Sequence, residues 1–334
     1  MIVILKQNPD KAHVDSLISW LKDKGLDINY SEGKSQTILG LIGDTTQLDA
    51  DMISALDIVD SVRRIGEPYK KANRKFHPEN TVVKVGNTQI GDGALTIMAG
   101  PSAIESEEQM TAVAKAAKEA GATLLTGGAF MPRTSPYAFG GLKEEGIRLQ
   151  KAAGAAYDLP VVTEIMDISQ LDSFQDVDLI VVGQRNMQNY ELLQALGKTQ
   201  KPILLKRGVS ATYEELLMSA EYILSEGNPN VILCERGTRS FEPFTKNTLD
   251  LSIIPALKEK THLPVVVDPS RACGNYELVP SLAYAAVAAG ADGIILDCHP
   301  NPASAKADAA QQIKTDTLAD VAKKCFEIHE LVNA

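Results

Sequence analysis

Five cationic side chains lie at or just after the ends of five different short apolar runs of this sequence. They are Arg133, Arg185, Lys206, Arg236 and Arg271. A cluster of fixed cations costs self-repulsion unless an anion normally lies among them. If the five runs converge in the fold, the simplest occupant of the cluster is a phosphorylated small molecule.

The segment Arg133-Thr134-Ser135 has the chemistry of a phosphate site by itself. It combines a planar guanidinium fork with two hydroxyl donors, which suits phosphate oxygens. A single arginine at a strand end is more simply explained by an ion pair with a neighbouring carboxylate. Five such cations at five strand ends favour a bound ligand.

The apolar runs that precede these cations predict a parallel sheet. Short aliphatic runs alternate with amphipathic segments of helical period, which is typical of βα units. Eight strands followed by eight helices match a closed (β/α)8 TIM barrel, whose strands deliver their carboxyl-terminal residues to one mouth. An open doubly wound sheet is the alternative. The runs occupy residues 95–100, 123–128, 159–164, 179–184, 202–207, 231–236, 263–268 and 293–298.

The first 66 residues predict a separate small α/β domain. Strands at 1–6, 28–31, 37–42 and 58–64, with helices at 10–24 and 46–56, give the order βαββαβ of a ferredoxin-like domain. Residues 67–80 are polar and basic, as in a linker. We expect the barrel domain to span 81–334 and to begin with a β-hairpin turning at Gly86 and Asn87.

Charge and composition exclude several classes of partner. The net charge of -10 disfavours nucleic acid and anionic membranes, because an acidic surface repels polyanions. No apolar stretch of this sequence is long enough to span a membrane, and we expect neither a membrane-spanning segment nor a signal peptide. The four cysteines have no metal-site spacing and lie in apolar runs, so we expect buried, reduced thiols and a cytoplasmic protein.

Seven segments of the chain resemble one enzyme family along its whole length. They are AGPS at 99–102, GGAFMPRTSPYAF at 127–139, GQRNMQN at 183–189, LLKRG at 204–208, LCERGTR at 233–239, VVDPSR at 266–271 and LDCHPNP at 296–302. The family is the 3-deoxy-D-arabino-heptulosonate 7-phosphate (DAHP) synthases of the shikimate pathway, in the branch with an N-terminal ferredoxin-like domain.

This resemblance implies an aldol-like condensation of phosphoenolpyruvate with erythrose 4-phosphate at the barrel mouth. It implies that Arg133, Thr134 and Ser135 hold the aldose phosphate. The enolpyruvate phosphate would be held by Arg185, Lys206 and Arg236. It also implies a regulatory N-terminal domain that binds an aromatic amino acid, and a homo-oligomer, either a dimer or a tetramer.

The family's metal site is altered in this chain. The family holds a divalent metal between a Cys, a His, a Glu and an Asp, and the matching residues are Ser102, Arg271, Asp297 and Asp308. A guanidinium stays protonated and cannot coordinate a cation. We therefore predict no metal and no cofactor. We expect Arg271 to replace the metal by pairing with Asp297 and Asp308, which makes these three residues and Lys206 the catalytic candidates.

The contacts to the carboxylate of phosphoenolpyruvate are also replaced. Thr126 and Met131 stand where the family has an Arg and a Lys. Charge-assisted hydrogen bonds contribute roughly 1.5 to 3 kcal/mol each. Their loss puts the usual pose of phosphoenolpyruvate in question, whereas both phosphate sites remain.

Three functions fit this pattern. The chain could perform the family condensation without a metal, or act on a different phosphorylated substrate that lacks the carboxylate. In the second case a Lys206 with a lowered pKa could form a Schiff base. The third function is a non-catalytic phosphate-binding or regulatory subunit.

Overall fold

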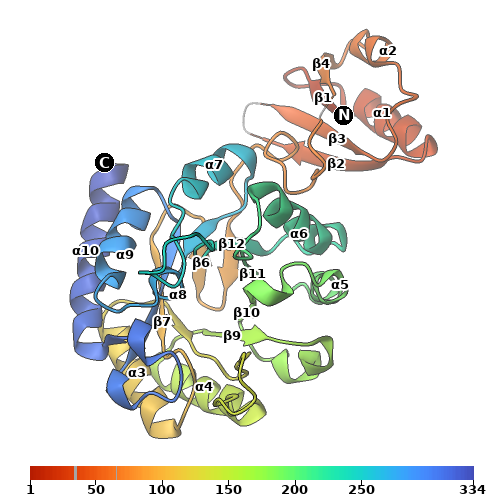
Figure 1. The fold of residues 1–334 in the computed structure, drawn as a ribbon. Coiled ribbons are helices and arrows are strands. Elements are labelled where there is room, and N and C mark those ends of the chain that lie inside the picture. Colours follow the sequence, from red (N-terminus) through yellow and green to blue (C-terminus); the bar gives the residue numbers. More distant parts are fainter. Residues whose placement is uncertain (34–35, 65) are drawn as a thin grey trace. The chain divides into compact units, whose positions relative to one another are not determined.

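The computed structural model describes residues 1–33, 36–64 and 66–334. The chain forms two compact units. Unit 1 contains Met1–Asn80 and Glu259–His262, and unit 2 contains Thr81–Lys258 and Leu263–Ala334 (Figure 1). Two separate stretches of the chain therefore form unit 1.

In the part of unit 1 that is described, two helices and four strands follow the order βαββαβ. These elements are β1 (Ile2–Leu5), α1 (Lys11–Asp23), β2 (Asp27–Glu32), β3 (Thr37–Ile42), α2 (Ala50–Ser54) and β4 (Val59–Arg63). The sheet is antiparallel in the order β2-β3-β1-β4. Helix α2 is shorter than the expected 46–56, because the Asp49 side chain accepts from the backbone N–H groups of Asp51 and Met52 and caps the helix there.

Residues 67–80, which we expected to form a linker, contribute to the interior of unit 1. Tyr69, Ala72 and Phe76 are at most 3% exposed. Phe76 packs with Ile2, Ile4 and Ile38. The segment has few aliphatic residues, but its aromatic rings cover a face of the sheet.

Unit 2, all of whose residues are described, contains a closed barrel of eight parallel strands. The strands are β7 (Thr96–Gly100), β8 (Leu124–Thr126), β9 (Val161–Ile165), β10 (Leu179–Val182), β11 (Ile203–Lys206), β12 (Val231–Glu235), β13 (Val265–Val267) and β14 (Gly293–His299). Pairing of β13 with β14 and of β14 with β7 closes the ring. A closed barrel is thus confirmed over the open sheet.

Helices surround the barrel strands (Figure 1). The surrounding helices are α3 (Glu107–Glu119), α4 (Glu144–Tyr157), α5 (Tyr190–Thr199), α6 (Tyr213–Ser225), α7 (Ile253–Lys260), α9 (Val279–Ala288) and α10 (Thr315–Asn333), and the short α8 (Pro269–Cys273) follows the end of β13. The expected helix after β9 is instead a 3-10 helix, Ile168–Phe174, which Asp167 caps. A short strand β15 (Ile313–Lys314) pairs with the end of β14.

A hairpin packs against the barrel interior and fixes its hydrophobic core. Strands β5 (Val83–Val85) and β6 (Thr88–Ile90) pair around the predicted turn. Val83, Val85 and Ile90 are fully buried and join one cluster with inward side chains of the barrel strands.

Among the described helices, none has the length and apolar character needed to cross a membrane.

Candidate active site at the barrel mouth

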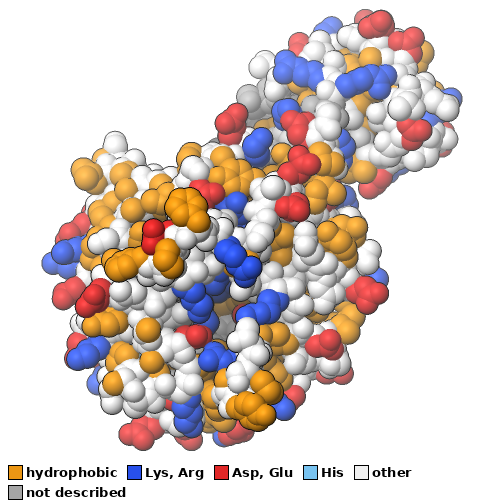
Figure 2. All heavy atoms as spheres, viewed as in Figure 1, with side chains coloured by type: hydrophobic (Ala, Val, Ile, Leu, Met, Phe, Trp, Pro, Cys, Tyr) orange, Lys and Arg blue, Asp and Glu red, His pale blue; other side chains and the backbone are white. Residues whose placement is uncertain are grey.

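A cavity of about 240 Å³ opens where the barrel strands end. Of the residues described, six cations and two carboxylates line it. They are Arg133, Arg185, Lys206, Arg236, Lys246 and Arg271, with Glu164 and Asp308. Figure 2 shows Lys and Arg side chains gathered around this hollow. All five cations singled out in the sequence therefore line one cavity, and Lys246 joins them.

Lys206 ends β11 and is held by a buried carboxylate. Its Nζ donates to Oδ2 of Asp268 at 2.7 Å. Burial disfavours the charged ammonium, but Asp268 and other nearby acids outweigh it, so the pKa of Lys206 is raised. The lowered pKa expected for the Schiff-base alternative is therefore wrong.

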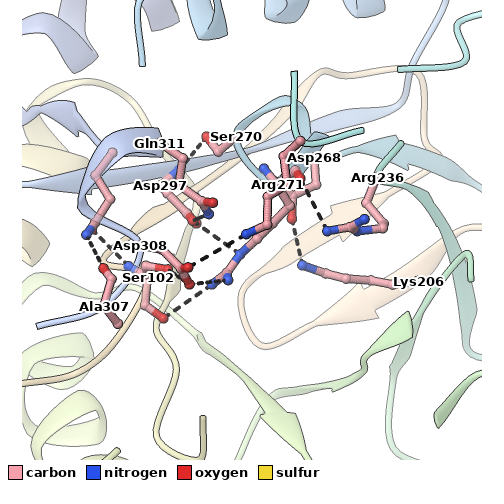
Figure 3. A network of polar contacts seen from close by, with 12 residues as sticks. Ser102, Lys206, Arg236, Asp268, Ser270, Arg271, Asp297, Ala307, Asp308 and Gln311 are labelled. Carbon is pink, nitrogen blue, oxygen red and sulfur yellow. Dashed lines mark hydrogen bonds and ion pairs between the residues drawn. The ribbon is translucent and has the colours of Figure 1, made fainter. Parts of the chain in front are cut away.

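Arg271 lies between the two aspartates with which we expected it to pair (Figure 3). Its Nε is 3.3 Å from Oδ2 of Asp297, and its Nη1 is 2.8 Å from Oδ2 of Asp308. Helix α8 positions it, because Oδ1 of Asp268 accepts from the Arg271 backbone N–H at 2.9 Å. Burial opposes the charge of Arg271, but Asp297 and Asp308 outweigh burial and raise its pKa.

The Asp308 carboxylate contacts side chains from several loops. Its Oδ2 accepts from Ser102 Oγ at 3.1 Å and from Arg133 Nη1 at 3.4 Å. Its Oδ1 is 3.7 Å from Nζ of Lys246. Burial disfavours the ionised carboxylate, but Arg271, Lys246 and Arg133 lower the pKa of Asp308 overall. Asp308 is thus an anion held among cations.

The residues that the resemblance places at a metal site do not have the chemistry to hold a divalent metal. The Arg271 guanidinium lies beside both carboxylates that would bind a cation, and it would repel one. Ser102 Oγ donates to Asp308. Among the described residues, no group of three or more His, Cys, Asp or Glu side chains is arranged to hold a metal ion.

Glu164 and Lys246 line the cavity, although neither was among the predicted site residues. Burial raises the pKa of the Glu164 carboxyl, and the surrounding cations oppose this without cancelling it. Burial also lowers the pKa of Lys246, with Arg271 and Arg236 adding to the effect. Glu164 follows an apolar run and could have been found by that signal. Lys246 lies ten residues beyond Arg236 in a loop, where no strand-end signal points to it.

The other predicted residues divide into three groups. Arg133, Thr134 and Met131 line the cavity, whereas Ser135 and Thr126 are not among the described residues that line it. Ser102 and Asp297 are buried beneath it, at 0% and 4% exposed.

Gln184 also lines the cavity, and its buried Oε1 has no hydrogen-bond partner among the described residues.

Family models match both units. The model of the DAHP synthetase I family matches residues 74–334. The model of the DAHP synthase ferredoxin-like domain matches residues 1–67. Together they account for nearly the whole chain in the order that the fold displays.

Individual relatives agree with this result. The chain is 42% identical over 325 residues to a phospho-2-dehydro-3-deoxyheptonate aldolase of Thermotoga maritima, with 97% of this chain and 96% of that protein covered. It is 34% identical to 2-dehydro-3-deoxyphosphooctonate aldolase 1 of Arabidopsis thaliana, covering 65% of this chain and 82% of that protein.

A solved structure is similar over the same span. The crystal structure of the Thermotoga maritima DAHP synthase aligns with a TM-score of 0.77 and 41% identity, covering 99% of this chain and 97% of that one. The cationic mouth, the two-unit fold and the matches over both units lead to one conclusion: the chain belongs to the DAHP synthetase I family.

Proposed function

We propose that the protein condenses phosphoenolpyruvate with erythrose 4-phosphate in a DAHP synthase reaction that needs no metal ion. The observation that carries this proposal is the Arg271 guanidinium between Asp297 and Asp308, in a cavity that keeps the cations suited to two phosphates. Family membership supports the reaction type.

The side chains suggest a division of labour. Arg185, Lys206 and Arg236 would hold the phosphate of phosphoenolpyruvate, and Arg133 with Thr134 and Ser135 the phosphate of the aldose. The condensation joins C3 of phosphoenolpyruvate to the aldehyde carbon, consumes one water and releases phosphate. These contacts would align the reacting carbons, which lowers the entropic part of the barrier.

Arg271 and Glu164 are suited to the charge and proton changes of this reaction. Arg271 supplies a fixed positive charge near the developing alkoxide, where the family uses a metal. Glu164 lines the cavity with a raised pKa, so it keeps a proton to higher pH than an ordinary carboxyl and is suited to proton transfer. We add Glu164 to Lys206, Arg271, Asp297 and Asp308 as a catalytic candidate.

The decisive experiment is a product assay with and without metal. Metal-stripped protein is mixed with both substrates in a chelator, and the seven-carbon phosphate is detected by mass spectrometry while phosphate release is followed. We expect equal rates in chelator and in manganese. A rate that appears only with manganese, or manganese density between Asp297 and Asp308 in a soaked crystal, would refute metal independence.

A second candidate function has its own support. Thr126 and Met131 supply no cation for a carboxylate, and the unpartnered Gln184 Oε1 can accept from a sugar hydroxyl. A phosphorylated, hydroxylated ligand without a carboxylate would suit these groups, with or without turnover. Binding of sugar phosphates but not of phosphoenolpyruvate would favour this function, and association with an active synthase would favour a regulatory subunit.

Family membership also supports proposals about regulation and assembly. We infer that unit 1 binds an aromatic amino acid and that the protein is a cytoplasmic dimer or tetramer, supported by the match of residues 1–67 and by four free, buried cysteines. Sedimentation and rate measurements with added phenylalanine or tyrosine test both points. A monomer whose rate ignores both amino acids would contradict them.

A further inference from the structure

Two neighbouring barrel strands each end in a charged dipeptide whose members have different surroundings. Lys206 lines the cavity, whereas Arg207 lies outside the described lining and is 6% exposed. Arg236 lines the cavity, whereas Glu235 is fully buried. The two buried members pair with each other, with Nη1 of Arg207 3.0 Å from Oε2 of Glu235. Removing one partner of such a buried ion pair strongly destabilises the folded protein, because the other charge is left buried without a partner.

Further groups surround the Arg207 guanidinium. Its Nη1 also lies 3.0 Å from Oδ2 of Asp250, and its Nε donates to the carbonyl of Ala211 at 2.8 Å. The Tyr213 ring centre is 4.9 Å from its Cζ, and the Tyr213 hydroxyl donates to Oδ2 of Asp250 at 2.8 Å. We call Arg207, Tyr213, Glu235 and Asp250 the clamp.

The clamp also fastens a loop that reaches the cavity. Oε1 of Glu235 accepts from the backbone N–H of Gly237 at 2.6 Å and from that of Asp250 at 3.4 Å. One carboxylate therefore holds both ends of residues 237–250, the segment that carries Lys246. Two members of the clamp, Arg207 and Glu235, are thus the chain neighbours of Lys206 and Arg236. Glu235 also anchors the base of the loop that bears Lys246.

We propose that the clamp is a positioning device for the phosphate site, setting the spacing of Lys206, Arg236 and Lys246 without touching the ligand. Phosphate recognition depends on donors held within a fraction of an ångström, so cations on strand ends and loops need such support. This inference rests on the proposed function only in assuming that these cations bind a phosphate. It does not require turnover.

Two conservative variants test the clamp while leaving the Arg207–Glu235 pair intact. Asp250→Asn removes a charge, and Tyr213→Phe removes the hydroxyl that bonds Asp250 and Ser252. Titration calorimetry with inorganic phosphate and with phosphoenolpyruvate measures affinity, and circular dichroism verifies folding. We expect Asp250→Asn to weaken binding of both probes by about tenfold and Tyr213→Phe by about threefold. Lys258→Met is the control, because it removes a 2.7 Å ion pair with Asp292, which precedes β14 at the opposite end of the strands.

A double-mutant cycle separates positioning from a purely structural role. If the clamp orients Arg236, the losses from Asp250→Asn and Arg236→Lys are smaller together than their sum. Additive losses, or unchanged affinity in folded Asp250→Asn, would overturn the proposal. If Asp250→Asn fails to fold, Tyr213→Phe in the same cycle decides.

The wild-type results keep the two proposals apart. Wild-type protein that binds phosphate but makes no seven-carbon product refutes the synthase function, and the cycle still decides the clamp. Wild-type protein that binds neither inorganic phosphate nor phosphoenolpyruvate overturns the clamp as well, because no phosphate site would then need positioning.

Discussion

Arg271 changes the chemistry of the mouth because a guanidinium can hold anions but cannot accept an electron pair from an oxygen. Its single charge also faces the carboxylates of Asp297 and Asp308, so part of its field is already compensated. The expected consequence is weaker polarisation of the aldehyde than a divalent metal would supply. The surrounding cations, which we propose to hold phosphate, still line the cavity.

Met131 allows a residue-scale test of the lost carboxylate contact. It lines the cavity, so Met131→Lys places an ammonium where the resemblance implies a lysine contact to the carboxylate of phosphoenolpyruvate. One charge-assisted hydrogen bond is worth about 1.5 to 3 kcal/mol, so we expect affinity for phosphoenolpyruvate to rise by about 10- to 100-fold. Calorimetry should find phosphate affinity raised much less, and Met131→Leu serves as the uncharged control. Equal gains for both ligands would show only a general charge effect.

Glu164 offers a second test at the same scale. Glu164→Gln keeps the side-chain size but removes the group with a raised pKa. We expect the condensation rate to fall by about 100-fold or more, while phosphate binds as well or better because a negative charge has left the cavity. Steady-state rates and phosphate titrations measure the two effects. A rate within a few-fold of wild type would remove Glu164 from the catalytic candidates.

The barrel strands could be predicted because strands buried on both faces read as continuous aliphatic runs. Val231–Glu235 and Gly293–His299, for example, are buried throughout, and their polar ends mark the mouth. The 3-10 helix at Ile168–Phe174 was missed, since its local composition does not distinguish it from a short α-helix. Lys246 and the clamp were missed because loop paths and pairings between distant residues leave no periodic signal.

Gly100 at the end of β7 shows how closely two elements approach at the mouth. A Cβ at this position would lie 1.7 Å from the Thr126 carbonyl oxygen of β8, and a backbone atom cannot simply rotate away. We expect Gly100→Ala to destabilise the fold by about 3 kcal/mol, measured as a lower urea midpoint by circular dichroism. Gly140→Ala is the matched control, because a Cβ there meets no atom within 4 Å. Equal midpoints for the two variants would contradict the packing argument.

At the scale of the whole molecule, the chain contributes to unit 1 from two distant parts of the sequence. Residues 259–262 belong to unit 1 although the barrel strands β12 and β13 flank them. Within unit 1, the His262 ring lies 4.2 Å from the His77 ring, and its Nε2 is 2.7 Å from the Lys71 carbonyl oxygen. That contact requires a proton on Nε2. Trp20, the only tryptophan of the chain, also lies in unit 1, so its fluorescence reports on this unit.

His262 should make the stability of unit 1 sensitive to acid. Burial lowers its pKa from 6.5 to about 4, so the unfolded chain takes up a proton at a higher pH than the folded one does. The contribution of neutral His262 to the free energy of unfolding is therefore complete above about pH 6.5. It is lost as the pH drops to about 4, by about 3 kcal/mol in total. Urea unfolding followed by Trp20 fluorescence measures this loss, which His262→Gln should reduce. His13→Gln, which alters a largely exposed histidine of the same unit, should leave it unchanged. An identical pH profile for wild type and His262→Gln would contradict the assignment.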